Sequence, residues 1–169
     1  MRVLGIDPGS QSTGFGIVDS DEARYIVRAF GTIKPSRRLP FHLKLNTIAL
    51  KVGEIIAAHS PDEVAIESPF YAQNIKTALA LGQVRGAVLA AVASTGRPLS
   101  EYSALEIKKA VTGYGQAEKQ QVNAMVRALL NVDEELETDA SDALATAICH
   151  LNTRMFQKTV EESAGRGKQ

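Results

Sequence analysis

The chain has a single cysteine, no tryptophan, no long uncharged apolar run and no excess of charge of either sign. One cysteine, Cys149, excludes an internal disulfide framework and fits a reducing cytoplasm. Its neighbours form a helical apolar pattern, which favours a buried structural thiol over a nucleophile. No uncharged apolar stretch approaches the roughly 18 residues of a membrane span, and the first residues show no signal-peptide pattern. We therefore expect a cytoplasmic protein without a membrane partner.

The charge balance by itself excludes little. The 19 Lys and Arg residues equal the 19 Asp and Glu residues, which at first argues against a polyanionic partner. If four of the acids form a metal site, 15 acids remain outside it against 19 basic residues. The rest of the molecule then has a modest positive excess of four, so composition alone leaves nucleic-acid binding open.

The hydrophobic pattern predicts one α/β domain over residues 1–158, followed by a polar, disordered tail at 159–169. Strands are expected at 2–7, 13–19, about 23–33, 64–67 and 98–102, and helices at about 41–59, 74–94, 104–111, 117–130 and from about 139 to 156. Three meander strands followed by alternating helices and strands predict a mixed five-stranded sheet with helices on both faces.

Four acidic residues lie where a metal-dependent nuclease needs them. Asp7 ends an apolar run before a Pro-Gly turn, and Glu67 closes another apolar strand. Asp139 and Asp142 are three residues apart, which puts both carboxylates on one face of a helix. Two strand ends and one helix start can converge, and four like charges gathered there repel unless hard cations neutralise them. The pattern suggests metal-assisted phosphodiester hydrolysis.

Five short segments, in the right order, carry a resemblance to a known family. They are GIDPG at 5–9, TGFG at 13–16, ALGQVRG at 80–86, AEK at 117–119 and DASDALA at 139–145. Over about residues 1–155 the chain resembles the RuvC family of bacterial Holliday-junction resolvases, in the ribonuclease H-like nuclease superfamily. Asp139 stands where some members have His. Ser68 stands where the family commonly has Gln, so any contact made by that amide is not carried over.

The resemblance implies a fold, a reaction and partners. It implies the ribonuclease H-like fold and metal-ligand roles for Asp7, Glu67, Asp139 and Asp142, with two Mg²⁺ ions per site and Mn²⁺ as an alternative. The implied activity is that of a crossover junction endonuclease, which resolves four-way DNA junctions in recombination and repair by paired, symmetric cleavage. The implied partners are a second copy of the chain and the RuvA–RuvB branch-migration complex.

Each acid taken alone has an ordinary structural interpretation. Asp7 alone favours a turn at a strand end, and Glu67 alone could be a solvated edge charge. Asp139 and Asp142 alone could complement the helix dipole, which is worth about 0.3–1 kcal/mol each. All four together, within the frame of the resemblance, favour the metal site.

Three further residues are candidates for DNA binding. Phe70 lies beside Pro69 and Tyr71; an aromatic pair in a generic loop packs back onto its domain more often than it stacks on bases. The family places a junction-inserting Phe at the position of Phe70, which favours DNA insertion there. Lysines on helix surfaces are usually only solvated, but the positions of Lys108 and Lys119 serve DNA binding and catalysis in the family. Arg85 is a weaker candidate.

The helix at 74–94 is apolar or small on nearly every face, which indicates burial on two sides. One side would meet the sheet. The other could meet a partner helix, with Gly82 and Gly86 one turn apart, although a helix wholly inside its own domain is equally consistent with the pattern. The resemblance favours the homodimer.

Two rival functions stay open at this point. One is a non-catalytic junction-binding module, against which the complete set of four acids argues. The other is an actin-like phosphotransferase, because Asp7-Pro8-Gly9 followed by Thr13-Gly14 also resembles the phosphate-binding hairpin of those kinases. Those enzymes need two such domains and an adenosine pocket, which 169 residues cannot supply.

Overall fold

A computed structural model describes residues 1–21, 24–68 and 74–166 of the chain. The strands are β1 Arg2–Asp7, β2 Thr13–Ser20, β3 Tyr25–Ile33, β4 Glu63–Glu67 and β5 Leu99–Tyr102. The helices are α1 Phe41–His59, α2 Ile75–Ser94, α3 Ala104–Thr112, α4 Lys119–Leu130 and α5 Thr138–Arg166. Each of these elements was predicted from the hydrophobic pattern, most of them within two residues of its observed ends.

The five strands form one mixed sheet in the order β3-β2-β1-β4-β5. β1, β2 and β3 pair antiparallel as a meander, whereas β4 pairs parallel with both β1 and β5. Ile6 lies opposite Ile66 in the parallel pair, so the next residues along both strands, Asp7 and Glu67, end β1 and β4 at the same edge of the sheet. The strand order therefore brings the first two acids of the sequence together.

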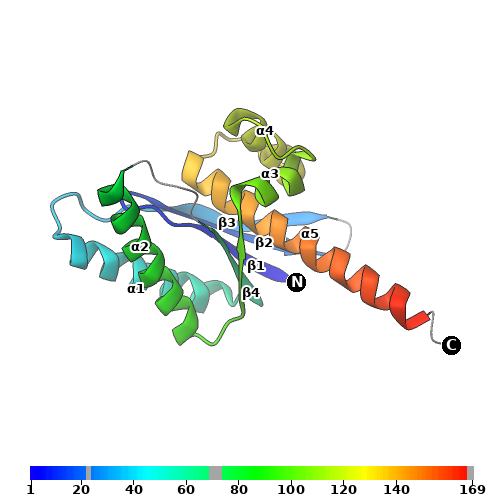
Figure 1. Ribbon diagram of the computed structural model, residues 1–169, viewed down its shortest axis with the longest axis horizontal. Coiled ribbons are helices and arrows are strands. Elements are labelled where there is room, and N and C mark those ends of the chain that lie inside the picture. Colours follow the sequence, from blue (N-terminus) through cyan, green and yellow to red (C-terminus); the bar gives the residue numbers. More distant parts are fainter. Residues whose placement is uncertain (22–23, 69–73, 167–169) are drawn as a thin grey trace.

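Helices cover both faces of the sheet (Figure 1). Val3, Val18 and Ala65 face a core built with α3, α4 and α5. The residues that alternate with them, including Leu4 and Ile66, face a second core built with α1 and α2. This alternation is the period of two that a strand buried on both faces requires. The prediction of a mixed five-stranded sheet with helices on both faces is confirmed.

The N-terminal half of α5 lies directly on the sheet because glycines leave room for it. A Cβ atom added at Gly5 would lie 2.0 Å from the carbonyl oxygen of Ala143, and one added at Gly14 would lie 1.8 Å from that of Asp139. Farther along the helix, the buried ring of His150 bonds to Tyr102 Oη through Nδ1 at 2.8 Å. These contacts fix the position from which α5 presents its acids.

The C-terminal end of α5 differs from the prediction. The polar composition after Phe156 indicates a helix end and a disordered tail from residue 159, but the helix continues to Arg166. The prediction is wrong for 159–166, and 167–169 lie outside the described residues. No glycine or proline occurs between Thr138 and Ala164, and helical hydrogen bonds form along the backbone without burial. The helix therefore projects from the body of the molecule (Figure 1).

Helix α2 has an unusual composition for its setting. Among the described residues it is the one helix long and apolar enough to cross a membrane by length and mean hydropathy. The criterion of an uncharged run did not indicate this, because Arg85 interrupts the helix. A single such helix is weak evidence for a membrane span. Val84, Val88 and Val92 pack on the sheet, whereas Ile75 and Leu79 on the opposite side are exposed.

Candidate active site

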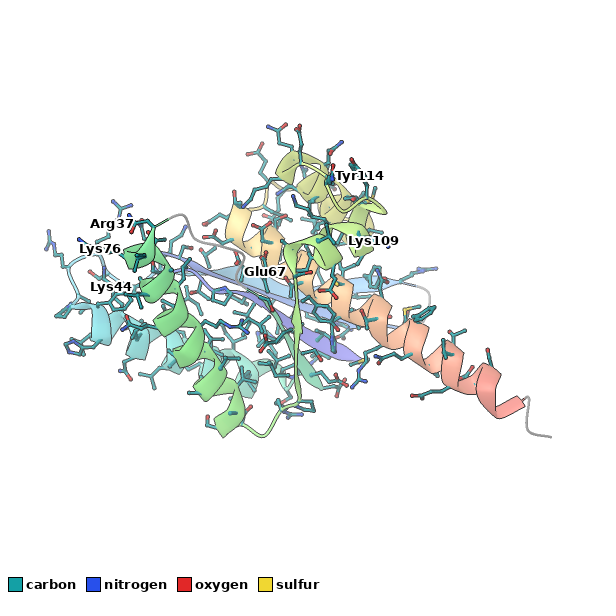
Figure 2. The ribbon with its side chains drawn as sticks, in the orientation of Figure 1. Arg37, Lys44, Glu67, Lys76, Lys109 and Tyr114 are labelled. Atoms are coloured by element: carbon teal, nitrogen blue, oxygen red, sulfur yellow. The ribbon has the colours of Figure 1, made fainter. Side chains whose placement is uncertain are left out.

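The four predicted acids lie at one edge of the sheet. Asp7 and Glu67 end the parallel neighbours β1 and β4. Asp139 and Asp142 lie in the first two turns of α5, which begins over Gly14, the β2 residue paired with Asp7. Figure 2 shows Glu67 between the helices on the two faces of the sheet. We call these four residues the acid cluster.

The pKa values show that the carboxylates of the acid cluster act on one another. Burial, followed by the negative charges of Glu67, Asp142 and Asp139, raises the pKa of Asp7 from its ordinary value to about 7. Burial also raises the pKa of Glu67, with the Asp142 charge as the next cause. Strongly shifted titrating groups that face a common opening are typical of functional sites.

Two lysines border the acid cluster. Lys119 Nζ lies 3.2 Å from Asp142 Oδ2, and the Asp142 charge is the main reason that the pKa of Lys119 is raised. Lys108 acts electrostatically on Glu67, and both lysines line a pocket of about 180 Å³ together with Glu67 and Asp142. The structure therefore brings Lys108 and Lys119 to the acid cluster. Phe70, the third predicted DNA-binding residue, lies outside the described residues.

The donor chemistry of the acid cluster fits a divalent cation. Its ligands would be carboxylate oxygens, which Mg²⁺ and Ca²⁺ prefer, and the mutual repulsion that raises the pKa of Asp7 would be relieved by a positive charge. Over the described ranges, however, no three Asp, Glu, His or Cys side chains are already gathered closely enough to hold a metal ion. The fit therefore rests on donor type and charge.

Arg85 holds the backbone of the acid cluster at Glu67. The sequence indicated this arginine only as a weak candidate for DNA binding. Arg85, on α2, has a side chain only 15% exposed. Its Nη1 donates to the backbone oxygen of Glu67 at 3.1 Å, and its Nη2 lies 2.5 Å from Glu101 Oε2 on β5. Glu101 also accepts a hydrogen bond from Ser68 Oγ at 3.3 Å. Arg85 therefore links α2, β4 and β5 at Glu67, the last residue of β4.

These contacts show what Ser68 and Arg85 bind, which the sequence left open. Ser68 stands where an amide is common in the family, and here its hydroxyl bonds to Glu101 beside Arg85. The one available signal was a charged residue in the middle of an otherwise small and apolar helix. Such a residue, when its surroundings are buried, is normally paired.

If the acid cluster cleaves DNA, as the resemblance implies, replacing Arg85 with Met is expected to slow cleavage of bound DNA about tenfold or more, because small displacements of a reacting group are costly. Affinity for DNA should change little, since the side chain points into the protein. Single-turnover cleavage and equilibrium binding would be measured separately, with Arg37→Met, in an exposed loop, as the matched control. Arg85→Lys should recover part of the rate. A reduced affinity with an unchanged single-turnover rate would instead make Arg85 a DNA contact.

The chain resembles known proteins over almost its full length. A family model described as crossover junction endodeoxyribonuclease RuvC matches residues 3–150. The RuvC protein of Magnetococcus marinus is 43% identical over 169 residues, which covers 100% of this chain and 94% of the relative. The RuvC protein of Geobacter metallireducens is 48% identical over 153 residues, which covers 90% of this chain and 93% of the relative.

A solved structure agrees with these relatives. T. thermophilus RuvC in complex with Holliday junction substrate superposes with a TM-score of 0.88 at 31% sequence identity, covering 93% of this chain and 96% of that one. The mixed sheet with helices on both faces is accordingly the ribonuclease H-like fold of these nucleases. On sequence and structure together, the chain belongs to the RuvC family of crossover junction endodeoxyribonucleases.

Proposed function

We propose that this protein is a crossover junction endonuclease that hydrolyses phosphodiester bonds in four-way DNA junctions. The observation that carries the proposal is the acid cluster, in which three carboxylates from β4 and α5 raise the pKa of the fourth, Asp7 at the end of β1. Its relatives are named for this activity, and the T. thermophilus structure contains a Holliday junction substrate.

The acid cluster would hold the catalytic metal, for which we propose two Mg²⁺ ions, with Mn²⁺ as an alternative. When bound, such ions lower the pKa of an attacking water and stabilise the leaving oxygen. The strands hold Asp7 and Glu67 rigidly, and Arg85 fixes the backbone of Glu67. Lys108 and Lys119 would bind phosphate oxygens and so align the DNA strand.

Cys149 is not the nucleophile. The thiol is buried, and burial raises its pKa to about 12, so it stays protonated at neutral pH. This agrees with the structural role that the helical pattern indicates, and it leaves hydrolysis by water as the chemistry that we propose.

Cleavage of a synthetic four-way junction, with and without Mg²⁺, tests the proposed function. A linear duplex with the same sequence serves as the control substrate. We expect cuts in two strands of like polarity at symmetric positions, only when Mg²⁺ is present and only in the junction. Tight junction binding without cleavage in Mg²⁺ or Mn²⁺ would instead support the non-catalytic junction-binding module.

We also propose that the active form is a homodimer whose interface includes α2. The exposed side of α2 carries Ile75, 79% exposed, and Leu79, 63% exposed, which is unusual for large apolar side chains on one helix. Added Cβ atoms at Gly82 and Gly86 would meet nothing within 4 Å, so these glycines also face away from their own sheet. A second copy placed by a two-fold axis would cover this face and present two sites to a two-fold junction.

Gly86→Leu tests this interface without disturbing the monomer. A leucine at this position has open space in a single chain, so the thermal midpoint of unfolding should change by no more than a few degrees. Sedimentation should show a monomer, and paired incision of the junction should be lost. Gly53→Leu on α1, where an added Cβ also meets nothing, is the matched control. A Gly86→Leu variant that remains dimeric and cuts both strands together would exclude Gly86 from the interface.

The remaining partners follow from the proposed activity. We propose that the protein acts with the RuvA–RuvB branch-migration complex in the cytoplasm and that the apolar face of α2 serves the second copy rather than a membrane. Co-sedimentation of the purified protein with RuvA–RuvB on a four-way junction, compared with the junction alone, would test the first of these assignments.

A further inference from the structure

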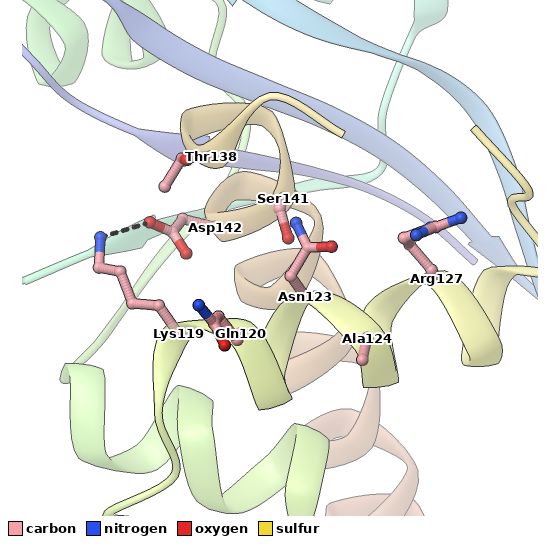
Figure 3. Close-up of a pocket in the computed structure, with 8 residues that line it drawn as sticks. All are labelled: Lys119, Gln120, Asn123, Ala124, Arg127, Thr138, Ser141 and Asp142. Atoms are coloured by element: carbon pink, nitrogen blue, oxygen red, sulfur yellow. Dashed lines mark hydrogen bonds and ion pairs between the residues drawn. The ribbon is translucent and has the colours of Figure 1, made fainter. Parts of the chain in front are cut away.

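A second pocket lies beside the acid cluster, between α4 and the start of α5 (Figure 3). It has a volume of about 340 Å³, and its lining residues are Lys119, Gln120, Asn123, Ala124, Arg127, Thr138, Ser141 and Asp142. We call it the α4–α5 pocket. Lys119 and Asp142 also line the pocket that contains Glu67 and Lys108. The ion pair of Lys119 and Asp142 therefore separates two pockets, one on each side, and a DNA strand that crosses the acid cluster would enter both.

The lining of the α4–α5 pocket is rich in hydrogen-bond donors. Asn123 and Gln120 contribute amide groups, and Thr138 and Ser141 contribute hydroxyl groups. Ser141 is only 2% exposed, and its Oγ atom is buried without a hydrogen-bond partner. Buried side-chain polar atoms nearly always have a partner, so an unpartnered hydroxyl beside a pocket is a candidate contact for a ligand or an ordered water.

Other hydroxyl residues of α5 show how Ser141 differs. Thr146, Thr153 and Thr159 each donate to the carbonyl oxygen four residues earlier, at 2.9–3.0 Å. This local bond is the usual way for a hydroxyl inside a helix to be satisfied. The carbonyl of Glu137, four residues before Ser141, accepts the backbone N–H of Ser141. The Ser141 hydroxyl makes no hydrogen bond to that carbonyl or to any other described group. The Ser141 hydroxyl is therefore left for a group that enters from the pocket.

The charges around the pocket favour an anion with several oxygens. Lys119 is paired with Asp142, so the attraction for an anion comes from the first turns of a long helix, where the free N–H groups carry partial positive charge. Arg127 turns away to donate through Nε to the backbone oxygen of Val132 at 3.3 Å, so it shapes the wall of the pocket. Asp142 is the one carboxylate in the lining, and Lys119 already neutralises it.

We propose that the α4–α5 pocket binds the phosphodiester group next to the scissile one, on the same strand of the junction. Ser141 and Asn123 would donate hydrogen bonds to its oxygens. The inference rests on the proposed junction endonuclease function and adds a second anchor for the same strand. Two anchored phosphates, one at Lys108 and one in this pocket, would hold the scissile phosphate over the acid cluster. Ser141 and Asn123 would thus be positioning residues, which act through the strand and not on the reacting atoms.

A scan of the DNA backbone tests the proposal directly. Synthetic four-way junctions would each carry one uncharged methylphosphonate near the scissile phosphate, and single-turnover cleavage in Mg²⁺ would be measured. With the parent protein we expect one flanking position at which this substitution slows cleavage about tenfold, the effect of losing a charge-assisted hydrogen bond. In Ser141→Ala, the charged junction should already be cut more slowly, and the methylphosphonate at that position should add little.

Asn123→Asp should reverse the effect of the methylphosphonate on the cleavage rate. The carboxylate has almost the shape of the amide but repels a phosphate, so the unmodified junction should be cut slowly and the junction with the neutral group at that position should be cut faster. Asn46→Asp, the same substitution on the exposed surface of α1, should respond to each methylphosphonate as the parent does. Ser141→Ala should unfold at the same temperature as the parent or higher, because it removes an unpartnered buried hydroxyl.

The outcomes are distinct. If both variants and the parent respond equally to the methylphosphonate at every position, the pocket does not hold a phosphate. If Ser141→Ala unfolds at a clearly lower temperature, the hydroxyl has a partner in the free protein and the inference fails on its premise. If the parent does not cut unmodified junctions at all, the proposed function fails first, which is a different result from equal responses in an active enzyme.

Discussion

Junction cleavage by Asp7→Asn is expected to be about 10²–10³-fold slower than by the parent, the loss typical of removing one charge-stabilising group from an active site. The amide keeps the shape of the carboxylate but removes the negative charge that would hold the metal. Junction affinity measured in EDTA should stay within about twofold of the parent, or improve slightly, because one charge that repels phosphates is gone. Glu67→Gln, Asp139→Asn and Asp142→Asn should behave alike.

The measurement is single-turnover cleavage of a four-way junction at saturating protein, with binding followed separately. Asp133→Asn is the matched control, since it makes the same chemical change at an exposed position outside the acid cluster. Cleavage by Asp7→Asn at close to the parent rate in Mg²⁺ would show that the acid cluster is not the catalytic site.

The stability of the metal-free protein is expected to fall as the pH rises from about 4 to about 7. The pKa of Asp7 is raised from 3.8 to about 7 by burial and by its acidic neighbours. At a pH below the pKa of Asp7 in the unfolded chain, Asp7 is protonated in both the folded and the unfolded state, and its stabilising contribution is fully present. It is lost as the pH rises through the folded value, because the unfolded chain then gives up its proton more readily. At about 1.36 kcal/mol per pKa unit, this loss is on the order of 4 kcal/mol.

Urea unfolding in EDTA at pH 5 and pH 8 would measure the part of this loss that occurs above pH 5. In Asp7→Asn the contribution is absent, so this variant should exceed the parent in stability by more at pH 8 than at pH 5. Adding Mg²⁺ at pH 8 should stabilise the parent more than the variant, since a ligand that binds only the folded state stabilises it. An equal pH dependence of stability in the two proteins would mean that the surroundings of Asp7 do not raise its pKa.

Local patterns in the sequence were enough to predict most of the fold and the acid cluster. Asp7 and Glu67 each follow a run of apolar residues, and a strand is recognised from such a run whatever lies beside it. The spacing of Asp139 and Asp142 places them on one helix face for the same local reason. The positions of the two lysines near these acids came from the family resemblance, which carries information about tertiary structure that the single sequence lacks.

Only the tertiary structure decided which polar groups are paired. Arg85 turns inward because the strand order places the end of β4 beside Glu101 of β5, and Arg85 bonds to both strands although 16 or more residues separate it from its partners in the chain. Ser141 differs from the threonines of its own helix because α4 forms a pocket wall in front of it. The sequence by itself determined the elements and their acids, since backbone hydrogen bonding and hydrophobic period are local. The partners of Arg85, Lys119 and Ser141 depend on which elements meet, and that is set by the packing of helices on a sheet whose strand order does not follow the chain.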